Sequence, residues 1–472
     1  MHQGLLGRQL KTGVAAKTVG IAPAKTDTGD LNFKRLSGTP MPQIATSADS
    51  YAEQFARFRR RCALPVALVP LRDDAFNRFD RLGFPTTRLE EWRFTNVAPI
   101  AAKQFVAPTA PTDYTRADLD ALHLPRLGGP ELVFVNGTFA PALSTTGGLP
   151  AGVRARSLAS ALADEHVDDA EAVASHIGRF AHIEGQAFTA LNTAFLRDGA
   201  VVEVASGVVV DTPIHLLFVT RSGSAPVLSQ PRVLVVTGAN SQVRLVESHA
   251  GEGETPYLSN SVTEVSVGND AVIDHYTFVR EDDAAFRVGS LHVTLGRASN
   301  FSSHTITLGG AFVRNEAHVV LAGEGGECTL NGLYLANGRQ LIDNQTTIVH
   351  AQPHCDSYEL YKGILDGRSR AVFNGKIIVR LDAQKTDAKQ SNKTLLLSED
   401  AQITTKPQLE IFADDVKCTH GATIGSFPPE LVFYFQSRGM DAETADGILT
   451  YGFAAEVVDS IALEPLDRKS VV

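Results

Sequence analysis

The residues best placed to do chemistry are a cysteine and a histidine two positions apart near the end of the chain. Cys418 and His420 lie in a segment, 414–421, that is typical of a strand. Side chains two apart on a strand share a face, so we expect these two to lie together on a protected face while Asp415 and Lys417 point to water. There a protonated imidazole would lower the thiol pKa, or both side chains would ligate one soft metal.

Two protein donors do not close a metal site. Iron or zinc held by sulfur and nitrogen normally takes three or four protein ligands, so a metal at Cys418 and His420 requires further donors, which a second subunit would supply. On spacing alone the alternative of a buried thiol beside a hydrogen-bonded histidine stays open. His354 and Cys355 form a weaker second candidate, because adjacent strand residues face opposite sides.

The chain lacks the common motifs of catalysis and phosphate binding. It contains no Gly-x-x-x-x-Gly-Lys-Ser/Thr loop, no Gly-x-Ser-x-Gly elbow, no His-Glu-x-x-His and no Cys-x-x-Cys. A carbohydrate-active β-helix enzyme would align several carboxylates along one groove, and Glu247, Asp274 and Asp343 are too scattered to nominate one. That enzyme class and a standalone zinc-binding module are the alternatives to the function inferred below.

Composition excludes several classes of protein. The chain has 472 residues, 43% of them hydrophobic, which predicts two or three domains or a repeat architecture. Four cysteines are too few for a secreted disulfide framework and favour a reducing compartment such as the cytoplasm. No apolar stretch approaches the roughly 18 to 20 residues of a membrane span. A net charge of −10 disfavours nucleic-acid binding.

The first part of the chain divides into a basic tail and a mainly helical domain. Residues 1–40 carry six Lys and Arg and two Asp, a charge of +4, and are expected to be a flexible tail, a plastid transit peptide or the product of an upstream start codon. Residues 41–199 are typical of helices with one small β element. Here we expect a basic amphipathic helix near 52–61, a helix beginning at Pro85, and a hairpin turn at Asn136-Gly137.

From about Val201 the hydrophobic periodicity changes from helical to alternating and stays so for some two hundred residues. Turn clusters recur roughly every 27 to 43 residues, each before an alternating run such as 272–278. One such unit cannot bury its inner face alone, so the units must stack on one another. The sequence therefore predicts a parallel β-helix over residues 200–424, with a β-sandwich as the alternative.

Residues 425–472 are predicted to form a C-terminal helical domain. Prolines at 428 and 429 precede one short helix, and Asp441 caps a second whose apolar residues recur at helical spacing. This apolar stripe exceeds what a terminal appendage needs. We expect it to pack on the end of the solenoid or to meet a partner.

Between roughly residues 50 and 460, a series of short segments matches the motifs of one family in the same order along the chain. The chain therefore resembles the SufB/SufD family of iron-sulfur cluster assembly proteins. The Cys-Gly-Ala-His segment and the Glu-His-Glu expected of the SufB branch are missing, so the chain resembles the other branch. The matching segments include Leu89-Glu-Glu-Trp92, Tyr361-Lys-Gly-Ile-Leu365, Phe373-Asn-Gly-Lys376, Gln390-Ser-Asn392, Pro407-Gln-Leu-Glu-Ile411, Val416-Lys-Cys-Thr-His-Gly-Ala-Thr423 and Ser437-Arg-Gly439.

This resemblance implies a mainly β protein, with a right-handed parallel β-helix between N-terminal and C-terminal helical domains. It further implies a scaffold subunit without ATPase or other enzyme activity, which pairs with SufB through the β-helix and binds the ATPase SufC through its C-terminal helices. In the family the histidine matching His420 is implicated in building the nascent cluster at the SufB interface, and Cys418 matches the neighbouring cysteine. The residues expected to contact the ATPase are Phe433, Tyr434, Arg438 and Phe453.

The cofactors implied by the resemblance belong to the complex. A transient iron-sulfur cluster is expected at the subunit interface, and no cofactor is expected on the isolated chain. A reduced flavin is associated with the assembled complex in this family, although no flavin motif is readable here. The isolated chain would form a homodimer if its exposed edge paired with a second copy. The expected location is the cytoplasm, or a plastid if residues 1–40 are a transit peptide.

Overall fold

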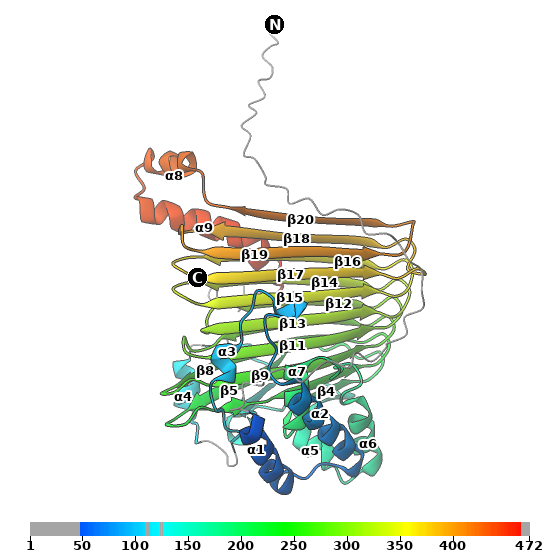
Figure 1. Cartoon of the computed structure of the whole chain (residues 1–472). Coiled ribbons are helices and arrows are strands. Elements are labelled where there is room, and N and C mark those ends of the chain that lie inside the picture. The colour runs from blue at the N-terminus through cyan, green and yellow to red at the C-terminus, as the bar shows by residue number, and fades with distance from the viewer. Residues whose placement is uncertain (1–47, 109–112, 123, 125, 464–472) are drawn as a thin grey trace. The chain divides into compact units, whose positions relative to one another are not determined.

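The computed structural model describes residues 48–108, 113–122, 124 and 126–463, so the basic tail predicted for residues 1–40 lies outside the described residues. Two long sheets dominate the fold, and from residue 232 onward successive strands alternate between them, so that each pair forms one rung of a solenoid (Figure 1). The rungs pair in parallel throughout this region. Parallel pairing confirms the β-helix and excludes the sandwich, whose strands are antiparallel.

Sheet 1 contains one strand of each rung. Asn300 pairs with Glu327, 27 residues on, and Asp356 pairs with Asp387, 31 residues on, so a rung takes about 27 to 31 residues. In spatial order, the strands of sheet 1 are β2 (Thr138–Phe139), β1 (Glu131–Val135), β5 (Ile214–Ser222), β8 (Gln242–Gly253), β10 (Val272–Arg280), β12 (Asn300–Thr307), β14 (Glu327–Ala336), β16 (Asp356–Leu365), β18 (Asp387–Leu396) and β20 (Lys417–Gly425).

Sheet 2 contains the other strand of each rung. Its strands, in spatial order, are β19 (Gln402–Ile411), β17 (Arg370–Val379), β15 (Leu341–His350), β13 (Phe312–Leu321), β11 (Phe286–Leu295), β9 (Leu258–Val267), β7 (Arg232–Thr237), β4 (Gly199–Val204) and β3 (Val153–Ser157), with β6 (Leu228–Ser229) beside β9. The segment assigned from sequence to a mainly helical domain thus also supplies β1 to β3. Its predicted hairpin turn is confirmed, because Asn136 and Gly137 join β1 to β2 with φ of 51° and 75°.

Aromatic rings and glycines interlock inside the solenoid. A Cβ atom on Gly332 of β14 would lie 2.3 Å from the ring of Tyr361 on β16. Reciprocally, a Cβ atom on Gly363 of β16 would lie 2.3 Å from the ring of Tyr334 on β14. Each ring therefore occupies the space that a side chain on the neighbouring strand would fill, which keeps the stacked rungs closely packed.

The N-terminal helices lie at the end of the stack opposite β20 (Figure 1). Tyr51, Phe55 and Phe188 pack in one buried cluster with Phe286 of β11 and Phe312 of β13, which holds the helices on sheet 2. The helices are α1 (Ala48–Arg61), α2 (Val69–Leu82), α3 (Ala98–Ala101), α4 (Arg116–Ala121), α5 (Leu158–Leu162), α6 (Val167–His176) and α7 (Ala187–Ala194), with 3-10 turns η1 (Val66–Leu68), η2 (Glu90–Trp92) and η3 (Pro141–Leu143).

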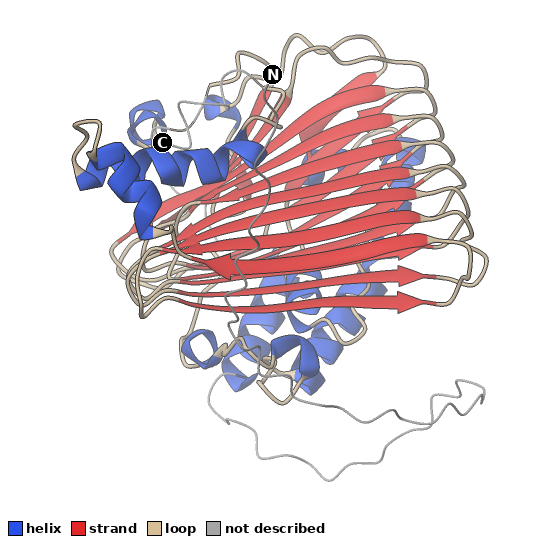
Figure 2. Cartoon of the chain, turned by 90° about the horizontal axis from the view of Figure 1, so that it is seen from above, coloured by secondary structure: helices blue, strands red, loops and turns tan. Residues whose placement is uncertain are grey.

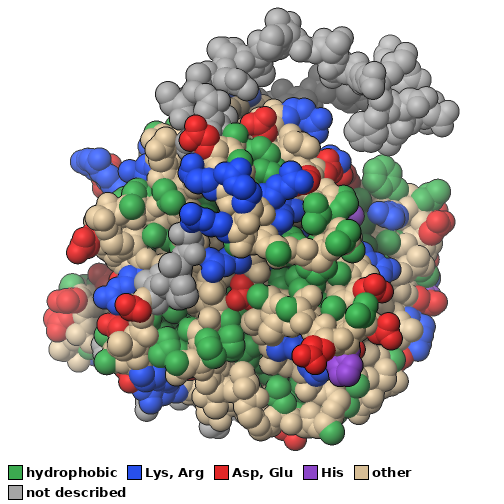
Figure 3. Space-filling view, turned by 90° about the horizontal axis from the view of Figure 1, so that it is seen from below, with side chains coloured by type: hydrophobic (Ala, Val, Ile, Leu, Met, Phe, Trp, Pro, Cys, Tyr) green, Lys and Arg blue, Asp and Glu red, His purple; other side chains and the backbone are tan. Residues whose placement is uncertain are grey.

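The predicted basic face of α1 is present. Arg59, Arg60 and Arg61 form its last turn and are exposed, and Figure 3, the view from below, shows Lys and Arg side chains gathered on this face. Positive charge at a helix C-terminus also stabilises the helix dipole. None of the helices in the described part of the chain combines the length and hydrophobicity needed to cross a membrane.

The helix expected from Pro85 is wrong, since this segment forms only the short turn η2. The guanidinium of Arg314 on β13 lies 3.7 Å from the centre of the Trp92 ring and donates to the carbonyl of Glu91 at 3.1 Å. Arg314 also pairs with the carboxylates of Glu316 and Asp343. These tertiary contacts hold the turn against sheet 2 and override the local helical preference.

The C-terminal helices α8 (Pro429–Gln436) and α9 (Ala442–Val458) lie beside the strands of sheet 1 (Figure 2). The predicted cap is confirmed, because the Asp441 carboxylate accepts from the backbone N–H of Thr444 at 2.7 Å. The second half of α9 packs on the outer face of sheet 1, where Lys362 Nζ donates to the carbonyl of Phe453 at 2.7 Å and lies 2.6 Å from the Glu456 carboxylate. The expected packing on the solenoid end is therefore wrong, and that end is left uncovered by helices of the described chain.

Candidate functional site

Cys418 and His420 lie on the last strand of the solenoid. Cys418 pairs in register with Ala388 of β18, and His420 pairs with Gln390. Both partners on β18 are buried inside the solenoid, at 0% and 3% exposure, so the two candidate residues belong to the row that faces inward. The prediction that they share a face is confirmed.

The expected protection of that face is wrong for the histidine. Cys418 is half-buried, whereas His420 is exposed. The reason is position, since β20 ends sheet 1 and, within the described residues, no further rung lies over its inward row. The alternative of a buried thiol beside a hydrogen-bonded histidine also fails, because His420 makes no hydrogen bond in the described part of the chain.

The electrostatics of the thiol run opposite to the sequence hypothesis. Partial burial raises the pKa of Cys418 above its ordinary value, and the nearby carboxylate of Asp387 raises it further. Near neutral pH the isolated chain therefore holds this side chain as a thiol. A partner that brings positive charge or a metal to the end of the solenoid would be needed to favour the thiolate.

A polar group that sequence reasoning missed lies inside the solenoid beneath His420. Gln390 Nε2 donates to Glu359 Oε2 at 2.7 Å, and Thr346 Oγ1 donates to Glu359 Oε1 at 2.5 Å. Burial raises the pKa of Glu359 to about 7 despite these hydrogen bonds. Gln390 Oε1 is buried without a hydrogen-bond partner. The alternation of apolar and polar residues does not specify the register in which strands of successive rungs pair. Without that register, the sequence could not show that Thr346, Glu359 and Gln390 lie together.

The remaining metal-ligating candidates are not brought together. Across the described residues there is no group of three or more His, Cys, Asp and Glu side chains placed to hold a metal ion. His354 lies in a turn with φ of 58° and is exposed, while the buried Cys355 donates to the carbonyl of Gly323 at 3.3 Å. This second candidate therefore does not form a site in the chain as described.

The four side chains expected to contact an ATPase subunit fall into two groups. Phe433 and Tyr434 of α8 are 68% and 50% exposed. Arg438, just after α8, is also exposed and stacks on Tyr434 with its guanidinium 3.5 Å from the ring centre. Phe453 is half-buried on α9, where Lys362 Nζ lies 4.7 Å from its ring centre, so it serves to attach α9 to sheet 1.

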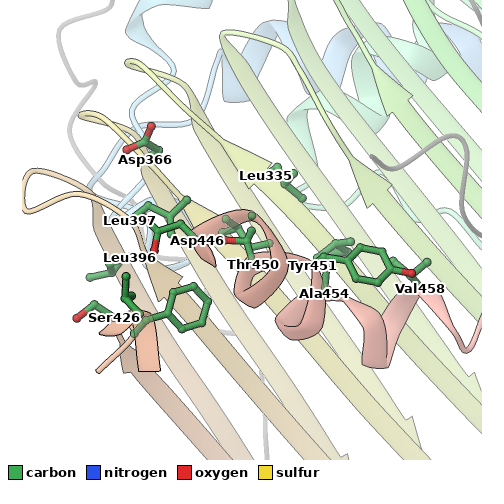
Figure 4. Close-up of a pocket in the computed structure, with 15 residues that line it drawn as sticks. Leu335, Asp366, Leu396, Leu397, Ser426, Asp446, Thr450, Tyr451, Ala454 and Val458 are labelled. Atoms are coloured by element: carbon green, nitrogen blue, oxygen red, sulfur yellow. The ribbon is translucent and has the colours of Figure 1, made fainter. Parts of the chain in front are cut away.

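A cavity of about 620 Å³ lies between these helices and sheet 1 (Figure 4). Its walls are mainly apolar, and the carboxylates of Asp366 and Asp446 are the charged groups among them. Representative lining residues are Leu335, Ile364 and Leu396 from the sheet and Val432, Thr450 and Ala454 from the helices.

Comparison with known proteins identifies relatives along most of the chain. The family model described as "SUF system FeS cluster assembly, SufBD core domain" matches residues 218–453, and the one described as "SufBD protein N-terminal region" matches residues 45–216. An iron-sulfur cluster assembly SufBD family protein of Synechocystis is 34% identical over 411 residues, which cover 85% of this chain and 89% of the relative.

Proteins named SufD are also similar. The iron-sulfur cluster assembly protein SufD of Escherichia coli is 29% identical over 392 residues, covering 82% of this chain and 88% of the relative. SufD of Bacillus subtilis is 26% identical over 445 residues, covering 91% and 98%. With the family models spanning both the N-terminal region and the core, the chain belongs to the SufBD family of iron-sulfur cluster assembly proteins, as a SufD-like member.

Proposed function

We propose that this chain is a scaffold subunit without ATPase activity that pairs with a SufB-like subunit and binds a SufC-like ATPase. The SufB-like subunit meets the uncovered end of the solenoid, and the nascent iron-sulfur cluster, which is cargo, forms there beside His420. The ATPase meets the exposed part of α8 and α9. Hydrolysis of ATP by that subunit reshapes the interface so that His420 and Cys418 become accessible to the cluster.

The observation that carries the proposal is the uncovered last rung. Strands β19 and β20 end their sheets, so each leaves a row of backbone N–H and C=O groups without a neighbouring strand of the described chain. Exposed edges of this kind favour pairing with another chain. Ile411, Phe412 and Ile424 are also exposed there, and large apolar side chains at an edge support a protein contact.

The chemistry at this end requires a second subunit. His420 and Cys418 offer one nitrogen and one sulfur, whereas iron bound by protein side chains normally has more donors. A facing cysteine from the partner would complete the ligand set. This is why we propose a shared site and no resident metal on the isolated chain.

A reduced flavin does not fit the cavity beside α9. The cavity near α9 has two carboxylates and no Lys or Arg among its lining residues, which would repel the phosphate of a flavin nucleotide. We therefore propose that a flavin, if one binds, is held by the assembled complex.

For the location of the protein we propose the cytoplasm, with a plastid as the alternative. One relative, ABCI7 of Arabidopsis thaliana, is named chloroplastic and is 30% identical over 407 residues.

The test is the variant His420→Ala, produced together with SufB-like and SufC-like subunits and purified without oxygen. We expect the complex to assemble normally, because the imidazole is exposed and makes no hydrogen bond with the described residues. Cluster formation, followed by visible absorption and by transfer to an apo acceptor protein, should be abolished.

The matched control is His166→Ala, another exposed histidine, which lies just before α6 and far along the chain from the last rung. It should mature clusters like the wild-type complex. Full maturation by His420→Ala, or equal loss in both variants, would contradict the assignment.

A further inference from the structure

The cavity beside α9 lies where the C-terminal helices stand away from sheet 1. Ala454, Val457 and Val458, in the second half of α9, are buried against sheet 1. In the part of α9 that precedes these residues, Ile448 and Tyr451 are 43% and 39% exposed. This part of α9 and all of α8 therefore overhang the sheet, and the cavity is the space beneath them (Figure 4).

The size and lining of this space suit a ligand of mixed character. Pockets that bind ligands commonly have volumes of about 300 to 1,000 Å³ and apolar walls with a few polar groups. This cavity falls in that range, and its polar groups include the carboxylates of Asp366 and Asp446. Both aspartates are exposed, and neither forms an ion pair with the described residues.

The C-terminal helical segment over the cavity is acidic, and one of its carboxylates, Glu456, pairs with Lys362 and Lys393 of sheet 1. Residues 428–460 contain six Asp and Glu and a single Arg, which is Arg438. Exposed apolar residues lie among these charges, including Leu431, Phe433 and Tyr434 on α8. An acidic surface with apolar side chains and a cavity at its base is complementary to a basic surface that carries a protruding apolar side chain.

We propose that this cavity receives large apolar side chains from a basic face of the ATPase subunit, with flanking Lys or Arg residues meeting Asp366 and Asp446. This inference rests on the proposed function, in which the C-terminal helices bind that subunit. It adds two details to that function. The apolar anchor of the ATPase enters the space between α9 and sheet 1, and the ATPase surface around the anchor is basic. Buried anchors at the centre of an interface contribute most of its binding energy.

Two glycines on α9 provide a matched pair of variants. Gly447 lines the cavity, and a Cβ atom built on it meets no atom within 4 Å, so a side chain there begins in open space. Gly452 also has open space around its Cβ position but is exposed and does not line the cavity. Both are helical glycines, so replacing either should help the helix to a similar degree.

The experiment compares Gly447→Phe with Gly452→Phe in binding to the SufC-like ATPase of the same organism, by calorimetry. Phenylalanine at 447 should fill the cavity, raise the melting temperature of the isolated chain and weaken ATPase binding at least tenfold. Phenylalanine at 452 should leave binding within about twofold of wild type. A wild-type affinity for Gly447→Phe, or an equal loss in both variants, would overturn the cavity as the anchor site.

A second arm tests the charge and does not depend on the fold of the filled variant. Asp366→Asn with Asp446→Asn should weaken binding and make it less sensitive to added salt, because two carboxylates no longer attract the partner. Unchanged affinity and salt dependence would overturn the basic character of the partner face. If the wild-type chain itself does not bind the ATPase, the proposed function fails and not only this inference.

Discussion

A carboxyl group, that of Glu359, is buried deep in the solenoid. Glu359 has 0% exposure, and its hydrogen-bond partners Thr346 and Gln390 are neutral. With no cation among these partners, burial dominates and raises the pKa of Glu359 from 4.5 to about 7. The protonation of this residue therefore changes over the physiological pH range.

The consequence is a pH-dependent stability that Glu359→Gln should remove. Because the folded state holds the proton more tightly than the unfolded chain, the stabilisation is complete below pH 4.5 and is lost as the pH rises through about 7. The interval of 2.5 pH units, at about 1.4 kcal/mol each, predicts that wild type loses about 3 kcal/mol of unfolding free energy relative to the variant.

Urea unfolding at pH 4.5 and pH 8 measures this difference. The control is Glu399→Gln, an exposed glutamate in the turn after β18, which should follow wild type at both pH values. Parallel pH curves for wild type and Glu359→Gln would show that the buried carboxyl does not titrate in this range.

Residues that carried the family resemblance turn out to serve packing. In Tyr361-Lys362-Gly363, the tyrosine ring lies over Gly332, and the glycine leaves room for Tyr334. Lys362 points outward and holds α9 through the Glu456 carboxylate. The sequence showed that these residues match the family. Why each residue type is needed there becomes clear only from its contacts with the neighbouring rung or with α9.

At the scale of elements, the turn η2 is held by one buried arginine. Arg314 is 2% exposed and pairs with Asp343, which is 0% exposed, and with Glu316. Asp343 also accepts a hydrogen bond from Thr95 just after the turn, at 2.6 Å. The turn and β13 thus share a buried network of charged side chains. Removing the arginine would leave the carboxylates of Asp343 and Glu316 buried without their positively charged partner.

Arg314→Met should therefore destabilise the protein by about 3 to 5 kcal/mol, as expected when one partner of a buried ion pair is lost. Trp92 is the only tryptophan of the chain, and it lies against Arg314, so its fluorescence reports on the turn directly. We expect a red shift of its emission at denaturant concentrations where wild type is still folded.

The comparison is Arg368→Met, whose ion pair with Asp400 has both side chains more than half exposed. Such a surface pair contributes about 0 to 1 kcal/mol, and this variant should unfold like wild type. A similar small effect for Arg314→Met would show that the network does not hold the turn.

The repeating elements were predictable and the attached ones were not. Alternation and regular turns specified stacked strands, because each rung needs neighbours to bury its inner face. The helix expected from Pro85 does not form because Arg314, more than two hundred residues later in the chain, contacts Glu91 and Trp92 and holds this segment as a turn. The place of α9 was equally hidden, since Lys362 and Glu456 are joined only by tertiary structure.

At the scale of the whole molecule, the uncovered end predicts self-association when no partner is present. Phe412 is 61% exposed directly after β19, at the edge where another chain would pair. The isolated chain should form a concentration-dependent dimer by analytical ultracentrifugation. Phe412→Asp should shift it to monomer, because a charge at this edge opposes pairing.

Val209→Asp is the control, since Val209 is 51% exposed but lies near the first rungs. It should leave the dimer intact. A dimer that survives Phe412→Asp and is lost in Val209→Asp would place the self-contact at the opposite end of the stack.

The candidate site shows the same limit of sequence reasoning on a larger scale. Alternation correctly placed Cys418 and His420 on one face, yet it says nothing about how many rungs follow. Whether that face is buried depends on β20 being the last strand of sheet 1, which is a property of the whole stack. Glu359 and Gln390, two rungs and one rung below, were hidden for the same reason.

Because each rung touches only its neighbours, the terminal rung at β20 is supported from one side alone. Opening should begin there and proceed inward, so backbone amides of β20 and β19 should exchange with deuterated solvent first, and those near β9 and β11 last. A protein that docks on this end would slow the exchange of the outermost amides without touching the N-terminal helices. In the free chain, the strand that carries His420 is therefore also the first to separate from the solenoid.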